Sequence, residues 1–136
     1  MNKVSTENMS ITINHETRRT MFSHWGLIDK QSVLDSYEFI YAADGFNPDY
    51  STLVDYRDIS EVNISAKDIK EILGAAGSFD TQIRKYAILV QNNIGRYALS
   101  QLYCVLSSAL SKGKAQRKAF RNLQEAEAWL DSDKCT

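Results

Sequence analysis

The alternation of hydrophobic and polar residues near the start of the chain predicts two neighbouring β-strands. Met9, Ile11 and Ile13 alternate with polar residues, which is the period of a strand with one buried face. Residues 16–18 are typical of a turn, and residues 20–25 form a second strand-like run. The two strands are therefore predicted to pair as a hairpin.

Further strands and helices alternate after this hairpin. The strands are expected at residues 52–56, 86–90 and 115–121. The helices are expected at about residues 29–44, 65–76, 93–110 and 122–130. The run at residues 86–90 is continuously apolar, which is typical of a strand covered on both faces in a parallel sheet. This order predicts an α/β fold with a mixed sheet of about five strands and about four helices.

Three of the predicted helices begin with a capping residue. Asp29 is expected to cap the first helix, Ser65 the second and Asn122 the last. Asp68 follows Ser65 by three residues, which is the spacing of a capping box. Glu125 stands at the same position after Asn122. The start of the second helix is the clearest local signal in the chain.

Helical periodicity also predicts which side chains are buried. In the first helix these are Val33, Leu34, Tyr37, Ile40 and Tyr41. In the second helix they are Ile69, Ile72, Leu73 and Ala76, before Gly77 at the helix end. In the long third helix they include Ala98, Leu102, Val105, Leu106 and Ala109. In the last helix they are Leu123, Ala126 and Leu130.

The composition is that of an ordinary globular protein, with 43% hydrophobic and 24% charged residues. A length of 136 residues is typical of one domain, so we expect a single domain at residues 1–136 with its core at about residues 9–130. The net charge of −1 lacks the basic excess of nucleic-acid binders, so no nucleic-acid partner is expected.

The distribution of polar and apolar residues also indicates the cellular compartment. Residues 1–10 are polar, unlike a secretory signal, and no apolar run approaches the roughly 18 residues of a membrane span. Cys104 and Cys135 do not form a motif, and we interpret both as reduced thiols. We therefore expect a cytoplasmic protein.

Four segments carry a resemblance to a known family. They are Leu53–Arg57, Ile64–Ile69, Ala87–Val90 and Ala119–Leu130. The last is the most specific, because Phe120-Arg121 is followed by Glu125-Ala126 and then by Trp129-Leu130. Together they resemble the bacterial SpoIIAA-like family, which is related in fold to STAS domains and to CRAL-TRIO lipid-binding domains. The resemblance covers about residues 9–130 and implies a STAS-like fold more than an activity, since many members are small proteins of unknown function.

The chain departs from these relatives at two places. STAS regulators that are switched by phosphorylation carry an Asp-Ser-Ser-Gly-like segment before the corresponding helix, where this chain has Asn63–Ala66. Ser65 matches the phosphorylated position. Many SpoIIAA-like members carry Gly-x-x-Arg-x-Tyr in the long helix, where Ala98 and Gln101 replace the glycine and the arginine.

Two candidate sites follow from the sequence. Ser65 is a candidate phosphorylation or partner site, because a phosphate there meets the N–H groups of a helix start; a capping serine is the favoured interpretation. Asn93, Gly95 and Arg96 are candidates for a ligand or anion contact after a central strand; an ordinary cap and a solvated arginine are the favoured interpretation.

Basic and aromatic residues give weaker signals. The basic residues between positions 112 and 121 are a candidate contact for a phosphate, an acidic partner or a membrane surface, and a solvated edge strand is the favoured interpretation; these residues are Lys112, Lys114, Arg117, Lys118 and Arg121. The aromatic residues are first of all core residues, and a cavity between helices and sheet is the alternative; they are Tyr37, Phe39, Tyr41, Tyr97, Tyr103 and Trp129.

No motif for catalysis is evident. His15 and His24 have no ligand partners at metal-binding spacing, so neither a metal nor a cofactor is expected. The pair Asp55 and Arg57 is interpreted as a structural ion pair. The leading hypothesis is a non-catalytic regulatory module that docks a protein partner. The alternatives are a carrier of a small apolar or lipid-like ligand and an enzyme with dispersed catalytic residues. The sequence leaves the oligomeric state open.

Overall fold

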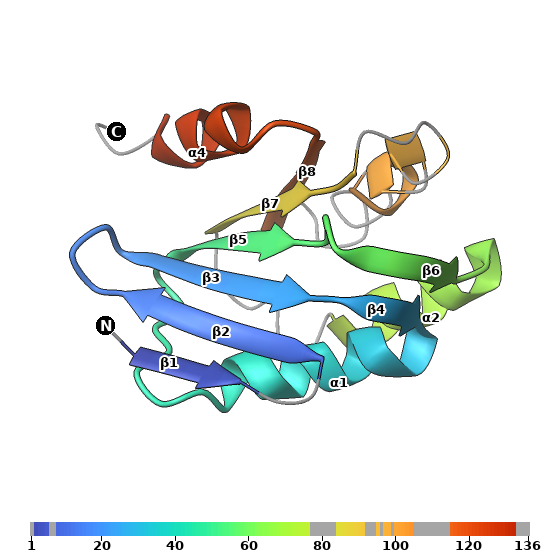
Figure 1. Cartoon of the computed structure of the whole chain (residues 1–136), viewed down its shortest axis with the longest axis horizontal. Coiled ribbons are helices and arrows are strands. Elements are labelled where there is room, and N and C mark those ends of the chain that lie inside the picture. The colour runs from blue at the N-terminus through green and yellow to red at the C-terminus, as the bar shows by residue number, and fades with distance from the viewer. Residues whose placement is uncertain are drawn as a thin grey trace.

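A mixed β-sheet is the central element of the structure, a computed structural model that describes residues 2–5, 8–76, 84–91, 95, 97–98, 100–104 and 115–132 (Figure 1). Its strand order is β1-β2-β3-β5-β7-β8. These strands are β1 (Asn2–Ser5), β2 (Met9–Asn14), β3 (Arg19–His24), β5 (Ser51–Asp55), β7 (Arg84–Leu89) and β8 (Ala115–Phe120). The pairs β1–β2 and β2–β3 are antiparallel, and β3, β5, β7 and β8 run parallel.

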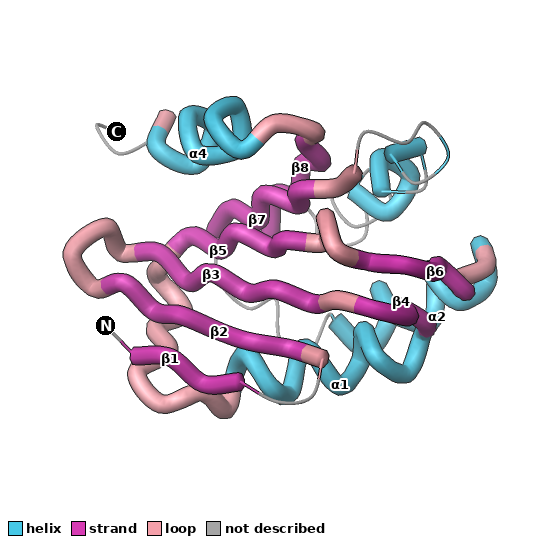
Figure 2. The backbone as a smooth tube through the Cα atoms, viewed as in Figure 1, coloured by secondary structure: helices cyan, strands magenta, loops and turns pink. Residues whose placement is uncertain are grey.

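Two of the parallel strands continue into a second, smaller sheet. β4 (Gly26–Asp29) follows β3, β6 (Ile59–Asn63) follows β5, and the two pair in parallel (Figure 2). Gly26 has a φ of +83°, a conformation that glycine adopts without strain, and the register shifts between Gly26 and Leu27. The sheet therefore bends at this point and extends beyond the ends of its central strands.

Helices cover both faces of the large sheet, because its central strands carry apolar side chains on each face. α1 (Lys30–Tyr41) and α2 (Ala66–Ala76) lie on one side and α4 (Leu123–Asp131) on the other (Figure 1). The α1 side is built on Ile11, Phe22, Val54, Ile88 and Ala119, with Ile40 of α1 packed on them. The α4 side is built on Leu53, Ala87, Leu89 and Phe120, with Ala126 and Leu130 of α4 packed on them.

The predicted α/β class, the mixed sheet and the helices are confirmed. The five predicted strands correspond to β2, β3, β5, β7 and β8, and helical residues at 95, 97–98 and 100–104 accompany α1, α2 and α4. β1, β4 and β6 were not predicted. They are short, and their sequences, such as Ile59–Asn63 with one buried residue, carry little of the apolar alternation that marks the other strands.

All three predicted helix caps are confirmed. The Asp29 carboxylate accepts a hydrogen bond from the backbone N–H of Ser32 at 2.8 Å. The Ser65 hydroxyl accepts one from the N–H of Asp68 at 3.1 Å, and the Asp68 carboxylate accepts one from the N–H of Ser65 at 3.0 Å. The Asn122 side chain accepts one from the N–H of Glu125 at 3.1 Å. Each cap satisfies N–H groups that the helix leaves unpaired and is worth about 1 kcal/mol.

The predicted buried faces of two helices need correction. In the long helix Ala98 and Leu102 are exposed, and the inward residue is Cys104, with Tyr97 and Tyr103 packed on the core. Successive helical positions are about 100° apart, so an error of one position turns the predicted face away from the sheet. In α4, Leu123 is 36% exposed because it stands in the first turn, ahead of the residues that reach the sheet. Gly77, Val105, Leu106 and Ala109 lie outside the described residues.

A buried arginine joins the start of β3 to α4. Arg19 is 6% exposed, and its guanidinium forms ion pairs with Asp131 and, at 3.8 Å, with Glu127. Its Nε also donates to the Ser51 hydroxyl at 3.5 Å. These contacts connect residues that lie at opposite ends of the described chain.

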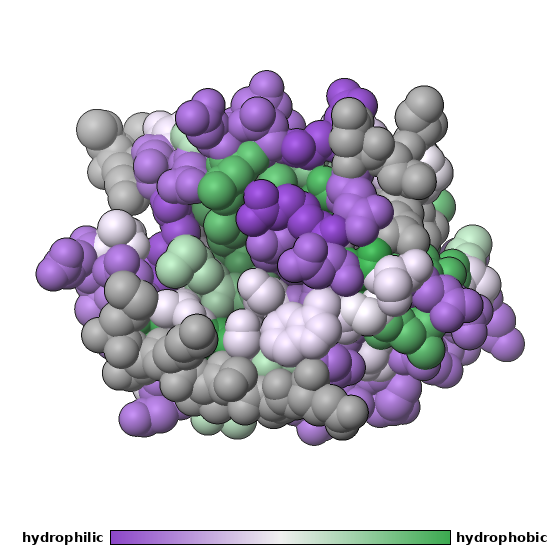
Figure 3. Space-filling model, viewed as in Figure 1, coloured by the Kyte–Doolittle hydropathy of each residue, from purple (hydrophilic) through white to green (hydrophobic). Residues whose placement is uncertain are grey.

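The surface on the α4 side is mixed in character. Polar side chains predominate over α4, hydrophobic ones are visible between α4 and the strands, and a second hydrophobic group lies over the end formed by β4 and β6 (Figure 3). Leu27 on β4 is 44% exposed. None of the helices in the described part of the chain is long and apolar enough to span a membrane.

Candidate ligand-binding site

A cavity of about 120 Å³ lies on the α1 side of the sheet. Its walls come from β3, β5, β7 and β8, from the β4–β6 sheet, from α1 and α2, and from helical residues 100 and 103. The apolar lining residues are Phe22, Ile28, Val33, Ile40, Val54, Ile59, Val62, Ile64, Ile69, Ile72, Ile88 and Val90. The polar lining residues are Ser36, Tyr37, Tyr41, Tyr56, Tyr86, Gln91, Ser100, Tyr103 and Arg117.

The sequence periods explain why these residues converge. Phe22, Val54 and Ile88 occupy equivalent positions on three parallel strands, so their side chains share one face of the sheet. The α1 residues lie three or four positions apart, as Val33, Ser36, Tyr37 and Ile40, and form one stripe of that helix. The cavity is the space that remains where this stripe meets the sheet.

One corner of the cavity is polar and centres on Arg117. This arginine is 6% exposed and stands opposite Tyr86 in the register of β7 and β8. Its guanidinium carbon lies 4.4 Å from the centre of the Tyr86 ring and 5.8 Å from that of Tyr103, within the range of cation–π attraction. One guanidinium nitrogen donates to the Tyr37 hydroxyl at 3.4 Å.

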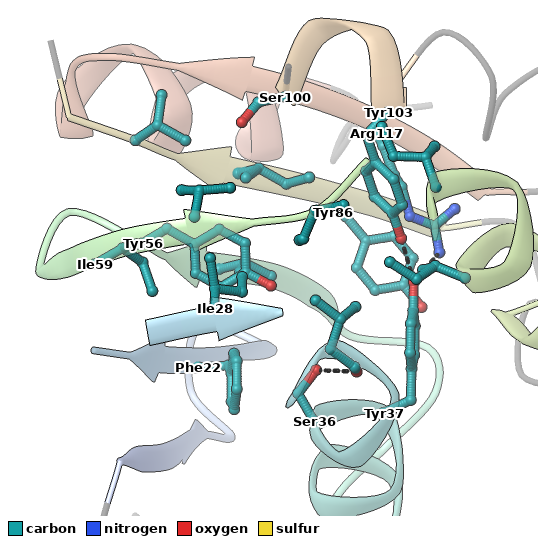
Figure 4. A pocket seen from close by; sticks show the side chains of 18 of the residues that line it. Phe22, Ile28, Ser36, Tyr37, Tyr56, Ile59, Tyr86, Ser100, Tyr103 and Arg117 are labelled. Atoms are coloured by element: carbon teal, nitrogen blue, oxygen red, sulfur yellow. Dashed lines mark hydrogen bonds between the residues drawn. The ribbon is translucent and has the colours of Figure 1, made fainter. Parts of the chain in front are cut away.

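Tyrosine hydroxyls extend this polar corner. The hydroxyls of Tyr37 and Tyr103 share a hydrogen bond of 2.5 Å, and those of Tyr41 and Tyr86 share one of 2.8 Å. Figure 4 shows Tyr37, Tyr86 and Tyr103 gathered around Arg117 at one end of the cavity. They come from three different elements, so only the folded chain assembles this group.

Burial raises the pKa of two of the tyrosines. It raises the pKa of Tyr103 well above the usual value of 10.0, and the neighbouring Tyr37 raises it further, while the positive charge of Arg117 opposes the rise. Burial likewise raises the pKa of Tyr56, again against the effect of Arg117. Both hydroxyls are therefore neutral hydrogen-bond donors at physiological pH.

The other end of the cavity is apolar. Phe22, Ile28 and Ile59 lie there, with the ring of Tyr56 beside them (Figure 4). The side-chain amide of Gln91 donates to the backbone carbonyls of Arg57, at 2.6 Å, and Ile59, at 2.9 Å. Gln91 thereby fixes the segment between β5 and β6 that closes this end.

The described lining contains few groups that ionise near neutral pH. Among the lining residues that the structure describes, none is an aspartate, a glutamate or a histidine, so the cavity lacks the usual groups that exchange protons near neutral pH. Cys104 is free and buried nearby, but burial raises its pKa to about 12, so it is not a thiolate nucleophile at neutral pH. No set of three or more potential metal ligands occurs within the described ranges.

The residues predicted as sites lie elsewhere. Ser65 is exposed and forms the capping box described above, so its geometry accords with the capping interpretation; its modification stays a prediction. Gly95 is exposed and helical. Asn93 and Arg96 lie outside the described residues.

The basic segment is divided between two environments. Lys118 is exposed, but Arg117 is buried, so the interpretation of the whole segment as a solvated edge strand is wrong for Arg117. Arg121 is exposed, with its guanidinium 4.6 Å from the centre of the Tyr97 ring. Lys112 and Lys114 lie outside the described residues.

Other predicted roles are confirmed. The Arg57 guanidinium donates to both carboxylate oxygens of Asp55, at 3.1 and 2.9 Å, as expected of a structural ion pair. Of the aromatic residues interpreted as core, Tyr37, Tyr41 and Tyr103 also line the cavity. The alternative of a cavity between helices and sheet is therefore correct for these three.

Sequence reasoning named Arg117 only as part of a solvated basic segment and did not place it in a cavity. A usable signal was the run Ala115-Gln116-Arg117-Lys118-Ala119, in which the arginine shares its strand face with two alanines. Small neighbours on that face leave room for the aromatic rings that cover the guanidinium.

Comparison with known proteins supports the fold. No protein-family model and no curated protein matches the chain. A similar solved structure is that of an uncharacterised protein of the DUF3478 family, with a SpoIIAA-like fold, from Shewanella loihica. The two structures superpose with a TM-score of 0.57 at 15% sequence identity, over 93% of this chain and 98% of that one. The SpoIIAA-like resemblance is thus shown at the level of the fold.

Proposed function

We propose that this protein is a small-molecule binding module that holds a mostly apolar ligand between its sheet and its helices, without transforming it. The observation that carries the proposal is the cavity of about 120 Å³ with its largely apolar lining. An apolar cavity of about 150 Å³ in another protein accommodates benzene, so the size suits a ring or a short branched chain. The proposal favours the carrier alternative over docking of a protein partner, which stays a prediction.

The apolar walls determine how much free energy of binding such a ligand gains. Burying a phenyl ring removes roughly 150 Å² of apolar surface from water and stabilises the complex by about 4 kcal/mol. This free energy corresponds to a dissociation constant of about 1 mM. Tighter binding requires the polar corner as well.

The proposal is tested by ligand titration and by filling the cavity. Benzyl alcohol is titrated into the purified protein while backbone amide resonances are followed by NMR. Val54→Phe places a ring in the cavity, whereas Leu53→Phe makes a comparable change on the opposite face of the same strand. Native mass spectrometry of freshly purified protein reports any ligand that is already bound.

We expect saturable shifts at cavity residues in the parent and in Leu53→Phe, and their loss in Val54→Phe. Thermal melts of both variants verify that each is folded. The proposal is wrong if the parent shows no saturable shifts, or if folded Val54→Phe binds benzyl alcohol as well as the parent does.

A further inference from the structure

We propose that the ligand held in the cavity is a small apolar carbonyl compound, whose oxygen accepts a hydrogen bond from the hydroxyl of Tyr56. This inference rests on the function proposed above and assigns the chemical class of the ligand. It follows from the free hydroxyl of Tyr56, from the way the fold holds that residue, and from the apolar side chains around it.

Tyr56 differs from the other four tyrosines that line the described part of the cavity. The hydroxyls of Tyr37 and Tyr103 share a hydrogen bond, and so do those of Tyr41 and Tyr86. Within the described ranges of the chain, by contrast, no residue forms a hydrogen bond with the Tyr56 hydroxyl. A ligand can therefore bind to this hydroxyl without breaking a hydrogen bond of the protein.

The backbone holds Tyr56 at a place where α/β sheets commonly bind ligands. Tyr56 directly follows β5, a central strand of the sheet that is parallel to both of its neighbours. Its N–H donates to the Leu89 carbonyl at 2.8 Å, and its carbonyl accepts from the Ile59 N–H at 3.2 Å. Its ring meets the His24 ring edge to face, with ring centres 6.3 Å apart. These contacts orient the side chain before a ligand binds, which limits the entropy lost on binding.

The Tyr56 hydroxyl faces the cavity. Figure 4 shows it directed inwards, from a ring that lies beside Ile28 and Ile59. The hydroxyls of Thr20 and Thr52 also have no hydrogen-bond partner among the described residues, but both residues are fully buried and neither lines the cavity. Of these three hydroxyls, that of Tyr56 is the one a ligand can reach.

The surroundings of this hydroxyl favour a carbonyl over an alcohol. Burial raises the pKa of Tyr56 well above the usual value of 10.0, so the hydroxyl is a neutral donor at pH 7. A carbonyl oxygen accepts this hydrogen bond and brings no hydrogen of its own. An alcohol and Tyr56 have two O–H hydrogens between them but form one hydrogen bond, so one hydrogen stays unpaired beside Phe22, Ile28 and Ile59. An unpaired polar group in apolar surroundings weakens binding.

Three probes of matched shape test the class of the ligand. Cyclopentanone, cyclopentanol and methylenecyclopentane share one ring and carry a carbonyl, a hydroxyl and a methylene group at the same position. Each is titrated into the whole chain at pH 7, and dissociation constants are measured from the NMR shifts of cavity amides. We expect cyclopentanone to bind severalfold more tightly than cyclopentanol, because its polar atom is fully paired.

Variants then assign the hydrogen bond to Tyr56. Tyr56→Phe keeps the ring but leaves a bound carbonyl oxygen without its donor. Cyclopentanone should therefore bind about tenfold more weakly to this variant, whereas methylenecyclopentane should bind as it does to the parent. Tyr103→Phe is the matched control, because it removes the same atom from the other end of the cavity. It should leave the affinity for cyclopentanone unchanged.

Thermal melts of the unliganded variants provide a second readout. Tyr103→Phe loses the hydrogen bond to Tyr37 and should melt at a lower temperature than the parent. Tyr56→Phe loses no hydrogen bond of the described chain and should melt at the temperature of the parent or above it. If Tyr56→Phe lowers the melting temperature as much as Tyr103→Phe does, the Tyr56 hydroxyl already has a partner and the inference is wrong.

The outcomes separate this inference from the proposed function. If benzyl alcohol binds to the parent but cyclopentanone does not, or if Tyr56→Phe leaves the affinity for cyclopentanone unchanged, the carbonyl inference is wrong and the binding function stands. The inference also fails if Tyr56→Phe weakens cyclopentanone and methylenecyclopentane equally, if Tyr103→Phe has the same effect as Tyr56→Phe, or if cyclopentanol binds as tightly as cyclopentanone. If neither benzyl alcohol nor any of the three ring probes binds, both proposals fail.

Discussion

The ion pairs of Arg19 lead to an asymmetric prediction about stability. Arg19 is buried, with 7% of its side chain exposed, whereas the side chains of Asp131 and Glu127 are 48% and 46% exposed. Asp131→Ala removes one acceptor and leaves the guanidinium buried. Arg19→Met removes the buried charge itself and leaves two carboxylates that water can reach.

The magnitudes follow from this difference in burial. Breaking a fully buried pair by removing one partner costs about 3–5 kcal/mol, and an exposed pair contributes about 0–1 kcal/mol. The Arg19 pair lies between these limits, and Glu127 remains 3.8 Å from the guanidinium after the change. We therefore expect Asp131→Ala to lower the free energy of unfolding by about 2 kcal/mol. Arg19→Met should lower it by less than about 1 kcal/mol, because an apolar chain of similar length fills the same space.

Urea denaturation at pH 7 measures both values from the shift of the unfolding midpoint. The double variant Arg19→Met/Asp131→Ala should resemble Arg19→Met alone, since the carboxylate has no buried charge left to satisfy. If Arg19→Met destabilises the protein more than Asp131→Ala does, then the pair contributes net stability and our account of the buried charge is refuted.

Three further predictions concern other parts of the fold. Ser65→Ala should lower the free energy of unfolding by about 1 kcal/mol, whereas Ser65→Asp should leave it nearly unchanged. If pull-downs show that either variant loses a protein partner at unchanged stability, Ser65 is more than a helix cap. Thr52→Val should raise stability by about 1 kcal/mol in urea denaturation, because the buried Thr52 hydroxyl has no hydrogen-bond partner among the described residues; a loss of stability would contradict this. The raised pKa values of Tyr56 and Tyr103 stabilise the fold fully below pH about 10, and this stability is lost as the pH rises above it; a melting temperature that stays constant from pH 9 to 12 would contradict the assignment.

Local features of the sequence were predictable because their interactions span few residues. The caps at Asp29, Ser65 and Asn122 each join a side chain to a backbone N–H three residues later. Such bonds form from local geometry and need no knowledge of the partner elements. The central strands were predictable for a similar reason, since their pattern of apolar positions is visible within a few residues.

The polar corner could not be predicted in the same way. Arg117 is buried by Tyr86 from the neighbouring strand and by Tyr37, whose hydroxyl accepts a hydrogen bond across 80 residues of sequence. A basic residue on a strand at the edge of a sheet is usually solvated, so the residue type alone predicts a position on the surface. The register of β7 and β8 is needed before the arginine and the rings are known to meet.

The helix α4 is synthesised after all the strands whose apolar face it covers. Leu53, Ala87 and Leu89 lie on the sheet face that α4 covers, and they are made well before residues 123–131. A nascent chain that has reached only the end of β8 therefore carries an uncovered apolar sheet. Exposed surface of this kind is where chaperones bind and where incomplete chains associate. Ribosome stalling between β8 and α4 would thus leave this sheet face exposed until the helix emerges and covers it.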